Sequence, residues 1–289
     1  MPQSTLLIET PSGKSAATEN FPVGSALLPR ALRPHVATFY AFARAIDDIA
    51  DNPALDPADK IARLNAFAAT LTGHPAGHPF TESGLEKAEA LRHSLRETGV
   101  TAQHALDLIS AFKQDAVKNR YDNWAELIDY CTRSAAPVGR YLLDLHGEDK
   151  RHYPLSDALC NALQIINHLQ DCADDYADLD RVYLPLDWME GARIDVTALA
   201  GPQASPGLHQ VFYLTTLNTA RLLDDARRLP GALKSRRLAL ESAVIVKIAE
   251  RLTKRLRRED PLARPIKLGK TETLQCAATG IWSVLLGKL

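Results

Sequence analysis

The sequence lacks the short motifs that mark several large classes of enzyme. It has no GxG, and therefore no dinucleotide-binding fingerprint, and it has no GxxxxGK[ST] phosphate loop and no HExxH zinc motif. Paired Glu and ExxH sequences, which build di-iron sites in helical bundles, are also missing. Any chemistry of this chain therefore has to come from another set of residues.

Cysteine, net charge and long hydrophobic runs are scarce too. The four cysteines form no CxxC pair, so we interpret them as reduced thiols of a cytoplasmic protein. The 34 basic and 35 acidic residues give a net charge of -1, which argues against general nucleic-acid binding. No apolar run approaches the roughly 20 residues that span a bilayer, and residues 1–20 do not resemble a secretory signal. We expect membrane contact to be peripheral at most, at the inner face, through basic stretches such as 227–237 and 247–258.

Convincing strand patterns are absent, and helix patterns follow one another along the chain. We expect helices over residues 31–51, 57–72, 82–98, 102–119, 123–146, 155–178, 208–228, 238–258 and 271–286. Pro137 should kink or break the fifth of them. No linker is long enough to separate domains, so we predict a single all-α domain over residues 1–289, with residues 1–17 poorly ordered.

Two short acidic clusters stand out in the predicted helices. The first is Asp47-Asp48-Ile49-Ala50-Asp51 and the second is Asp171-Cys172-Ala173-Asp174-Asp175. In each, the outer carboxylates are four residues apart, which stacks them one turn apart on one helix face. Carboxylates with no His or Cys at ligand spacing suit a hard cation such as Mg²⁺. Two such clusters facing a cavity would bind a diphosphate through bridging magnesium ions and promote its departure as a leaving group.

The surroundings of the second cluster argue against the simpler interpretation, a solvated helix face, which most acidic pairs at this spacing are. A polar stripe runs along an otherwise largely apolar helix and consists of Gln164, Asn167, Asp171 and Asp175. Polar groups in apolar surroundings are costly unless they bind something. Farther along, Arg181 could supply a guanidinium for phosphate oxygens, and Tyr183 a hydroxyl or a ring face.

The first cluster follows directly on an apolar and aromatic run, residues 39–46. Arg44 lies three and four residues before Asp47 and Asp48, so it could offset their charge by salt bridges, contact a diphosphate, or do both. Tyr40 and Phe42 could be plain core residues. Beside a site that generates a cation, their aromatic faces would stabilise positive charge on carbon.

In this order, the motifs closely resemble the squalene and phytoene synthase family, the head-to-head all-trans prenyl synthases. The resemblance extends from about residue 18 to about residue 270. It rests on Asn20-Phe21-Pro22, Arg33-Pro34-His35, residues 39–44, the two acidic clusters, Tyr130-Cys131, Pro137-Val138-Gly139, residues 164–175 and Arg181-Val182-Tyr183-Leu184-Pro185. Either acidic cluster alone would be a weak signal, whereas both together, with RVYLP after the second, are a strong one.

Within the family, the sequence is most similar to the bacterial hydroxysqualene synthases of the hopanoid pathway. The similar segments are residues 19–44, 133–147, 161–176 and 260–263. The chain departs from the wider family at Gln170, where most members have Arg, at Asn20, where Ser is frequent, and at Ala135-Ala136, where Ala-Gly is usual. Losing an Arg removes a fixed positive charge from the diphosphate site, which disfavours a site for two farnesyl diphosphates.

The resemblance implies an isoprenoid-synthase helical bundle around a central cavity. It also implies a lyase that uses two or three Mg²⁺ ions and no NADPH. Such an enzyme would ionise presqualene diphosphate, and water would capture the rearranged cyclopropylcarbinyl cation to give hydroxysqualene and diphosphate.

The predicted site residues fall into three overlapping groups. The catalytic candidates are Asp47, Asp51, Asp171, Asp175, Tyr130, Asn167 and Tyr183. The candidates for substrate binding are Asn20, Phe21, Tyr40, Arg44, Gln164, Gln170 and Arg181. The candidate metal ligands are Asp47, Asp48, Asp51, Asn167, Asp171 and Asp175. His168, beside the stripe, is expected mainly as a packed core histidine.

Two other functions stay open. One is a condensing enzyme that makes presqualene diphosphate, dehydrosqualene or phytoene from two prenyl diphosphates. The other is a non-catalytic scaffold with the family fold, against which the intact clusters argue. Gln170 and Ala135-Ala136-Pro137 favour the hydroxysqualene synthase over the condensing enzyme. The partners we expect are presqualene diphosphate as substrate and a presqualene diphosphate synthase, with no nucleic acid.

Overall fold

The structure is a computed structural model that describes residues 8–9, 27–74 and 84–287. Asn20 and Phe21, which we predict to bind substrate, lie outside the described residues. So does the segment 1–17 that we expect to be poorly ordered, apart from Ile8 and Glu9.

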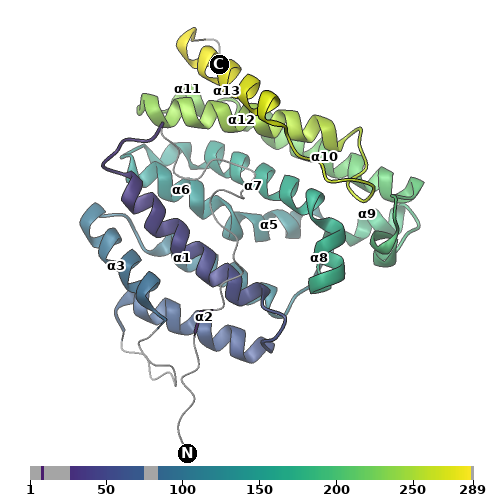
Figure 1. The fold of residues 1–289 in the computed structure, drawn as a ribbon, viewed down its shortest axis with the longest axis horizontal. Helices are drawn as coiled ribbons and strands as arrows, with labels where there is room; N and C mark the ends of the chain where they lie inside the picture. Colours follow the sequence, from purple (N-terminus) through teal and green to yellow (C-terminus); the bar gives the residue numbers. More distant parts are fainter. Residues whose placement is uncertain (1–7, 10–26, 75–83, 288–289) are drawn as a thin grey trace, which may run out of the picture. The chain divides into compact units, whose positions relative to one another are not determined.

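Most of the described residues are helical, which confirms the all-α class (Figure 1). The α-helices are α1 (Arg33–Asp51), α2 (Pro57–Thr72), α3 (Glu86–Thr98), α4 (Gln103–Asp115), α5 (Trp124–Ser134), α6 (Ala136–Leu145), α7 (Tyr153–Gln170), α8 (Cys172–Leu179), α9 (Leu186–Gly191), α10 (Pro206–Ala226), α11 (Leu229–Ala232), α12 (Arg236–Leu256) and α13 (Lys270–Leu285). Two short 3-10 helices are η1 (Lys150–His152) and η2 (Val196–Ala200), and two short strands are β1 (Arg120–Tyr121) and β2 (Val182–Pro185).

The chain divides into two compact units between Lys118 and Asn119. In the first unit, α1 packs against α2, α3 and α4. Phe42 of α1 meets Phe67 of α2 in the core, with ring centroids 5.8 Å apart. The start of α2 is as predicted, because Asp56 accepts a hydrogen bond from the amide of Asp59 at the N-terminus of the helix. The single-domain organisation stays a prediction.

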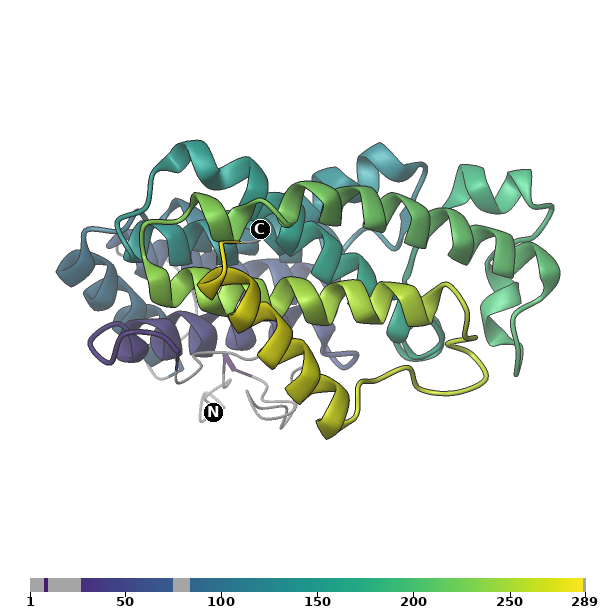
Figure 2. The same cartoon turned by 90° about the horizontal axis from the view of Figure 1, so that it is seen from above.

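In the second unit, α7 is the central helix, and it packs against α5, α6, α10 and α12 (Figure 1). From above, α10 and α12 run side by side and the yellow α13 crosses α12 (Figure 2). The crossing depends on Gly280, since a Cβ there would lie 2.8 Å from the carbonyl oxygen of Ala243. A larger side chain at this position would push the two helices apart.

Two of the predicted helices are interrupted, the first of them where Pro137 leads us to expect a kink or break. The predicted helix 123–146 breaks at Ala135, and Pro137 lies in the first turn of α6. Backbone N–H groups in a first turn have no partner within the helix, so a proline there costs no helical hydrogen bond. The predicted helix 155–178 breaks at Asp171, whose backbone has φ -104° and ψ 7°. The expectation of an unbroken helix over residues 155–178 is therefore wrong. Asp side chains compete for backbone hydrogen bonds and favour helix ends over helix interiors.

The expected absence of strands is also wrong, although only for one short pair. β1 and β2 pair in parallel, and the amide of Val182 donates to the carbonyl oxygen of Asn119 at 2.9 Å. The segment 181–194, which lies between two predicted helices, thus holds β2 and α9. A two-residue strand has no periodicity of its own to read, and its partner lies four α-helices away in the chain.

Candidate functional site

The first acidic cluster lies in the last turns of α1. A stripe along this helix consists of Tyr40, Arg44, Asp47 and Asp51. All four side chains are half-buried, whereas Phe42, Ile46 and Ile49 on the other faces are fully buried. The sequence pattern thus places the two outer carboxylates of the cluster on a face that is only partly covered.

Arg44 pairs with two carboxylates of its own helix. Its Nη2 lies 2.7 Å from Asp47 Oδ2, and its Nε and Nη2 both donate to Asp48 Oδ1 at 3.0 Å. Asp48 is 8% exposed, and the ion pair with Arg44 compensates for the hydration that its carboxylate loses on burial. The charge-offsetting role that we predict for Arg44 is therefore present in the structure, and its contact with a diphosphate stays a prediction.

The second acidic cluster lies where α7 gives way to α8. The helical hydrogen bonds continue through the break, since the Asp171 amide donates to Asn167 O at 2.9 Å and the Asp175 amide to Asp171 O at 2.8 Å. Asp171 is exposed and Asp175 is half-buried in the first turn of α8, where the helix dipole stabilises a carboxylate. Asn167 and Gln164, one and two turns before Asp171, are also half-buried.

The predicted substrate contacts Arg181 and Gln170 lie next to this cluster with different surroundings. Arg181 is 6% exposed. Its backbone amide donates to the carbonyl oxygen of Asp175 at 3.0 Å, so the residue after α8 is bonded to the first turn of that helix. Gln170, the last residue of α7, donates its side-chain amide to the carbonyl oxygen of Ile266. That donor of Gln170 is engaged with the protein, so a role in substrate binding stays a prediction.

An aromatic cluster gathers around Tyr183 of β2. The His168 ring stacks on Tyr183 with centroids 3.6 Å apart and an interplanar angle of 13°. Tyr130 stacks on the same tyrosine at 5.6 Å, and Tyr121 contacts both tyrosines, at 5.2 Å from Tyr130 and 5.6 Å from Tyr183. The predicted residues Tyr130 and Tyr183 thus form one group with His168. Sequence reasoning missed Tyr121, because only the parallel pairing of β1 with β2 brings it here.

His168 is packed in the core, as expected. Burial lowers its pKa to about 3, and the positive charge of Arg181 acts in the same direction. Its Nε2 is buried and has no hydrogen-bond partner among the described residues. The imidazole is therefore neutral at neutral pH, and it offers a ring face and a nitrogen to the cluster rather than a charge.

We expect the free energy of unfolding to fall in mild acid because of His168. Its folded pKa lies below the unfolded value of 6.5, so this stability is complete above pH 6.5 and is lost as the pH falls toward the folded pKa. At pH 5 the loss from this one residue should be about 2 kcal/mol. Urea unfolding followed by circular dichroism at pH 7 and pH 5 measures it.

The same pair of measurements on two variants tests this assignment, with His168→Phe as the test and His209→Phe as the control. His168→Phe keeps a stacking ring and should show a smaller fall between pH 7 and pH 5. His209 is an exposed residue of α10, and its replacement should leave the wild-type fall in place. An equal fall in wild type and His168→Phe would contradict the assignment.

The donor set of the two clusters fits magnesium. Among the described residues, no three His, Cys, Asp or Glu side chains gather into one possible metal site. Mg²⁺ is usually held by one or two carboxylates together with water and substrate phosphate, rather than by a complete protein cage. Asp47 with Asp51, and Asp171 with Asp175, supply that kind of half-open pair. Because the clusters lie in different units, their facing one another stays a prediction.

Comparisons with known proteins agree on a family. The chain matches the model of the squalene/phytoene synthase family over residues 15–272. It is 42% identical to a hydroxysqualene synthase of Zymomonas mobilis over 268 residues, which cover 92% of this chain and 88% of that protein. The crystal structure of squalene synthase HpnC from Alicyclobacillus acidocaldarius has a TM-score of 0.70 and 33% identity, and covers 82% of this chain and 87% of its own. A dehydrosqualene synthase with a bound ligand, at 19% identity and a TM-score of 0.74 over 93% of each chain, supports the fold alone.

The fold and the comparisons define an all-helical isoprenoid synthase. The chain belongs to the squalene/phytoene synthase family, and the resemblance read from its motifs is confirmed.

Proposed function

We infer that the chain is a hydroxysqualene synthase, an enzyme that ionises presqualene diphosphate and lets water capture the rearranged cation. The observation that carries this inference is the 42% identity to a hydroxysqualene synthase across 92% of the chain. Both acidic clusters of the sequence are intact, which sets the chain apart from a scaffold. The products are hydroxysqualene and diphosphate, and no reductant is consumed.

We propose that the acidic residues hold two or three Mg²⁺ ions for the diphosphate. The ligands are Asp47, Asp48, Asp51, Asn167, Asp171 and Asp175. Bound magnesium neutralises the leaving diphosphate and so lowers the barrier to breaking the carbon–oxygen bond. The partly covered carboxylates support the proposal: Asp47 and Asp51 on α1 and Asp175 in α8 are half-buried, and Asp171 at the junction of α7 and α8 is exposed.

Cationic and amide side chains complete the proposed diphosphate contacts. Arg181 carries a permanent charge in a buried position beside the turn of Asp175, where it would be only weakly screened by solvent. Arg44 would divide its guanidinium between Asp47 and the diphosphate. Gln164 and Tyr40, both half-buried on the two stripes, would contact the rest of the substrate.

The aromatic cluster suits the second half of the reaction. The stacked faces of Tyr130 and Tyr183 would stabilise positive charge on carbon and exclude stray water. One water must still reach the cation, and an uncharged acceptor has to orient it. We propose Tyr130, Asn167, Gln164 and Tyr183 as the groups from which that acceptor comes.

The test is to incubate the purified protein and Mg²⁺ with presqualene diphosphate and, separately, with farnesyl diphosphate, without NADPH, and to identify the extracted lipid. Hydroxysqualene from presqualene diphosphate alone is the expected result. Consumption of farnesyl diphosphate would make the chain a condensing synthase. No turnover of either substrate would overturn the enzymatic proposal. A presqualene diphosphate synthase would be the functional partner that supplies the substrate.

We further propose that α13 contacts the membrane surface, where so apolar a product has to go. No described helix is long and apolar enough to cross a bilayer. Leu274 and Trp282 on α13 are 71% and 62% exposed, and no charged residue occurs between Thr273 and Gly287. The exposed Lys267 and Lys270 at the start of this helix would face anionic headgroups.

The double variant Leu274→Ser/Trp282→Ser should bind vesicles that contain phosphatidylglycerol at least about tenfold more weakly than wild type, because two large apolar side chains no longer enter the interface. Cosedimentation with the vesicles measures the bound fraction. Val117→Ser changes an equally exposed apolar residue of the first unit and serves as control. Equal binding by the double variant would refute the contact, and a change in oligomeric state instead would indicate that a protein covers this face.

A further inference from the structure

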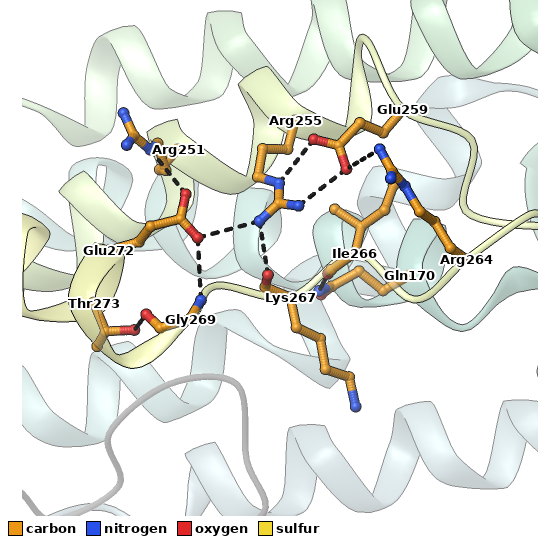
Figure 3. Close-up of polar contacts among 10 residues, drawn as sticks. All are labelled: Gln170, Arg251, Arg255, Glu259, Arg264, Ile266, Lys267, Gly269, Glu272 and Thr273. Carbon is orange, nitrogen blue, oxygen red and sulfur yellow. Dashed lines mark hydrogen bonds and ion pairs between the residues drawn. The ribbon is translucent and has the colours of Figure 1, made fainter.

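The segment between α12 and α13, residues 257–269, contains no helix or strand, yet its two ends are fixed to each other. We call it the connecting segment (Figure 3). Asp260 holds its first part by accepting hydrogen bonds from the amides of Ala204, at 2.7 Å, and Leu262, at 2.9 Å. Ile266, near its end, is 1% exposed. Because the segment has no regular secondary structure, these hydrogen bonds and the burial of Ile266 determine its position.

The guanidinium of Arg255, in the last turn of α12, is the common partner of these ends. It binds both carboxylate oxygens of Glu259, at 2.9 and 3.0 Å, where the segment begins. Its Nη1 donates to the carbonyl oxygen of Lys267 at 2.8 Å and to Glu272 at 3.2 Å. Glu272 in turn accepts from the amide of Gly269 at 3.1 Å. One side chain thus joins the start of the segment, its end and the first turn of α13 (Figure 3).

The connecting segment reaches α7 through a side-chain hydrogen bond. The amide of Gln170 donates to the carbonyl oxygen of Ile266, the residue before the Lys267 carbonyl that Arg255 binds. Gln170 is the last residue of α7, and Asp171 follows it at the helix break. The hydrogen bonds therefore form a continuous series from Arg255 through the backbone of residues 266–267 to the residue beside the second acidic cluster.

We propose that Arg255 is a positioning residue for Asp171. It holds the connecting segment where the Ile266 carbonyl fixes Gln170, and Gln170 fixes the junction of α7 and α8 that carries the carboxylate. The inference rests on the proposed role of Asp171 in binding magnesium. In this role Arg255 acts through the connecting segment rather than by contact with the diphosphate or the metal.

Geometry, not charge alone, is what this role requires. The planar guanidinium reaches Glu259 with two nitrogens and uses the third for Lys267 and Glu272. A lysine at this position keeps the positive charge but cannot make the two-pronged contact and the carbonyl contact together. Arg255→Lys should therefore loosen the segment without removing a charge.

The first measurement is hydrogen exchange of the unliganded protein. In Arg255→Lys, amides of residues 168–176 should exchange faster than in wild type, along with those of residues 257–272, while the urea midpoint stays close to wild type. Arg227→Lys is the matched control, since Arg227 also binds two acidic partners, Asp224 and Glu250, in a network outside the connecting segment. It should leave residues 168–176 unchanged.

The second measurement is calorimetric titration of inorganic pyrophosphate in the presence of Mg²⁺. Arg255→Lys should weaken binding about tenfold, the lower end of the loss expected when an outer partner of a metal site is removed. Gln170→Leu should weaken it to a similar extent, and the double variant should be no weaker than either single one, because both act through one series of contacts. Additive losses would overturn the proposal.

The two measurements separate this inference from the proposed function. Faster exchange confined to residues 257–272 in Arg255→Lys would overturn the positioning role, whatever lipid the enzyme makes. If residues 168–176 exchange faster but the wild-type protein does not bind pyrophosphate with magnesium, the magnesium assignment of Asp171 fails, while the structural coupling stands.

Discussion

Replacing Asp171 by asparagine is expected to lower turnover of presqualene diphosphate by about a thousandfold, with little effect on folding. The substitution keeps the size of the side chain but removes the negative charge that makes the second cluster attractive to magnesium. Loss of electrostatic stabilisation at a developing charge commonly costs two to three orders of magnitude in rate. Asp171 is exposed, so the asparagine side chain itself stays in contact with solvent and adds no buried polar group.

Asp174 gives the matched control for this variant. It belongs to the same acidic cluster and is equally exposed, but it lies about 100° around the helix axis from Asp175 and outside the polar stripe. Asp174→Asn should retain most of the turnover. Circular dichroism establishes that both variants are folded, and initial rates at several Mg²⁺ concentrations give the comparison. Near-normal turnover in Asp171→Asn would remove this residue from the metal site.

Asp47→Asn should have the second largest effect, a loss of at least about a hundredfold in turnover together with a higher Mg²⁺ requirement. On the half-buried stripe of α1, only Asp51 would then remain as a carboxylate. The helix should persist, because Arg44 still holds the buried Asp48 through its Nε and Nη2. The loss would thus come from the site rather than from the fold.

Asp59→Asn is the corresponding control in the first unit. Asp59 also pairs with an arginine of its own helix, Arg63, at 3.1 Å, and it is likewise about one-third exposed. Its replacement removes an equivalent salt bridge without touching the acidic cluster, so the Mg²⁺ dependence of the rate should be unchanged. A shift of similar size in both variants would point to general electrostatics rather than to a ligand.

Much of this architecture can be read from local patterns. Helix periodicity, the capping Asp56 and the position of Pro137 act over a few residues, and the structure follows them closely. The two acidic stripes could be found in the same way, because helical spacing alone places their members on one face. The family could be recognised because several such local motifs occur in a fixed order.

What the sequence does not reveal depends on residues far apart in the chain. The residues around Gln170 in the sequence do not indicate that its side-chain amide donates to the carbonyl oxygen of Ile266. Likewise, the residues around Arg255 are those of an ordinary surface arginine near a helix end, and they do not indicate its bond to the carbonyl oxygen of Lys267. Tyr121 joins Tyr183 only through the pairing of two very short strands. The break at Asp171 is a local feature that the prediction missed, although Asp favours helix ends, and the backbone hydrogen bonds continue through it.

The small parallel pair of β1 and β2 also bears on the order in which the second unit folds. Its two strands are separated in the chain by α5, α6, α7 and α8, so joining them early would close a long loop at a high entropic cost. The helices can form from local contacts, and the strands can meet only after those helices have docked. The stacking of Tyr121 on Tyr183 should therefore be among the last native contacts to form, and the protein would acquire its helices before it acquires its aromatic cluster.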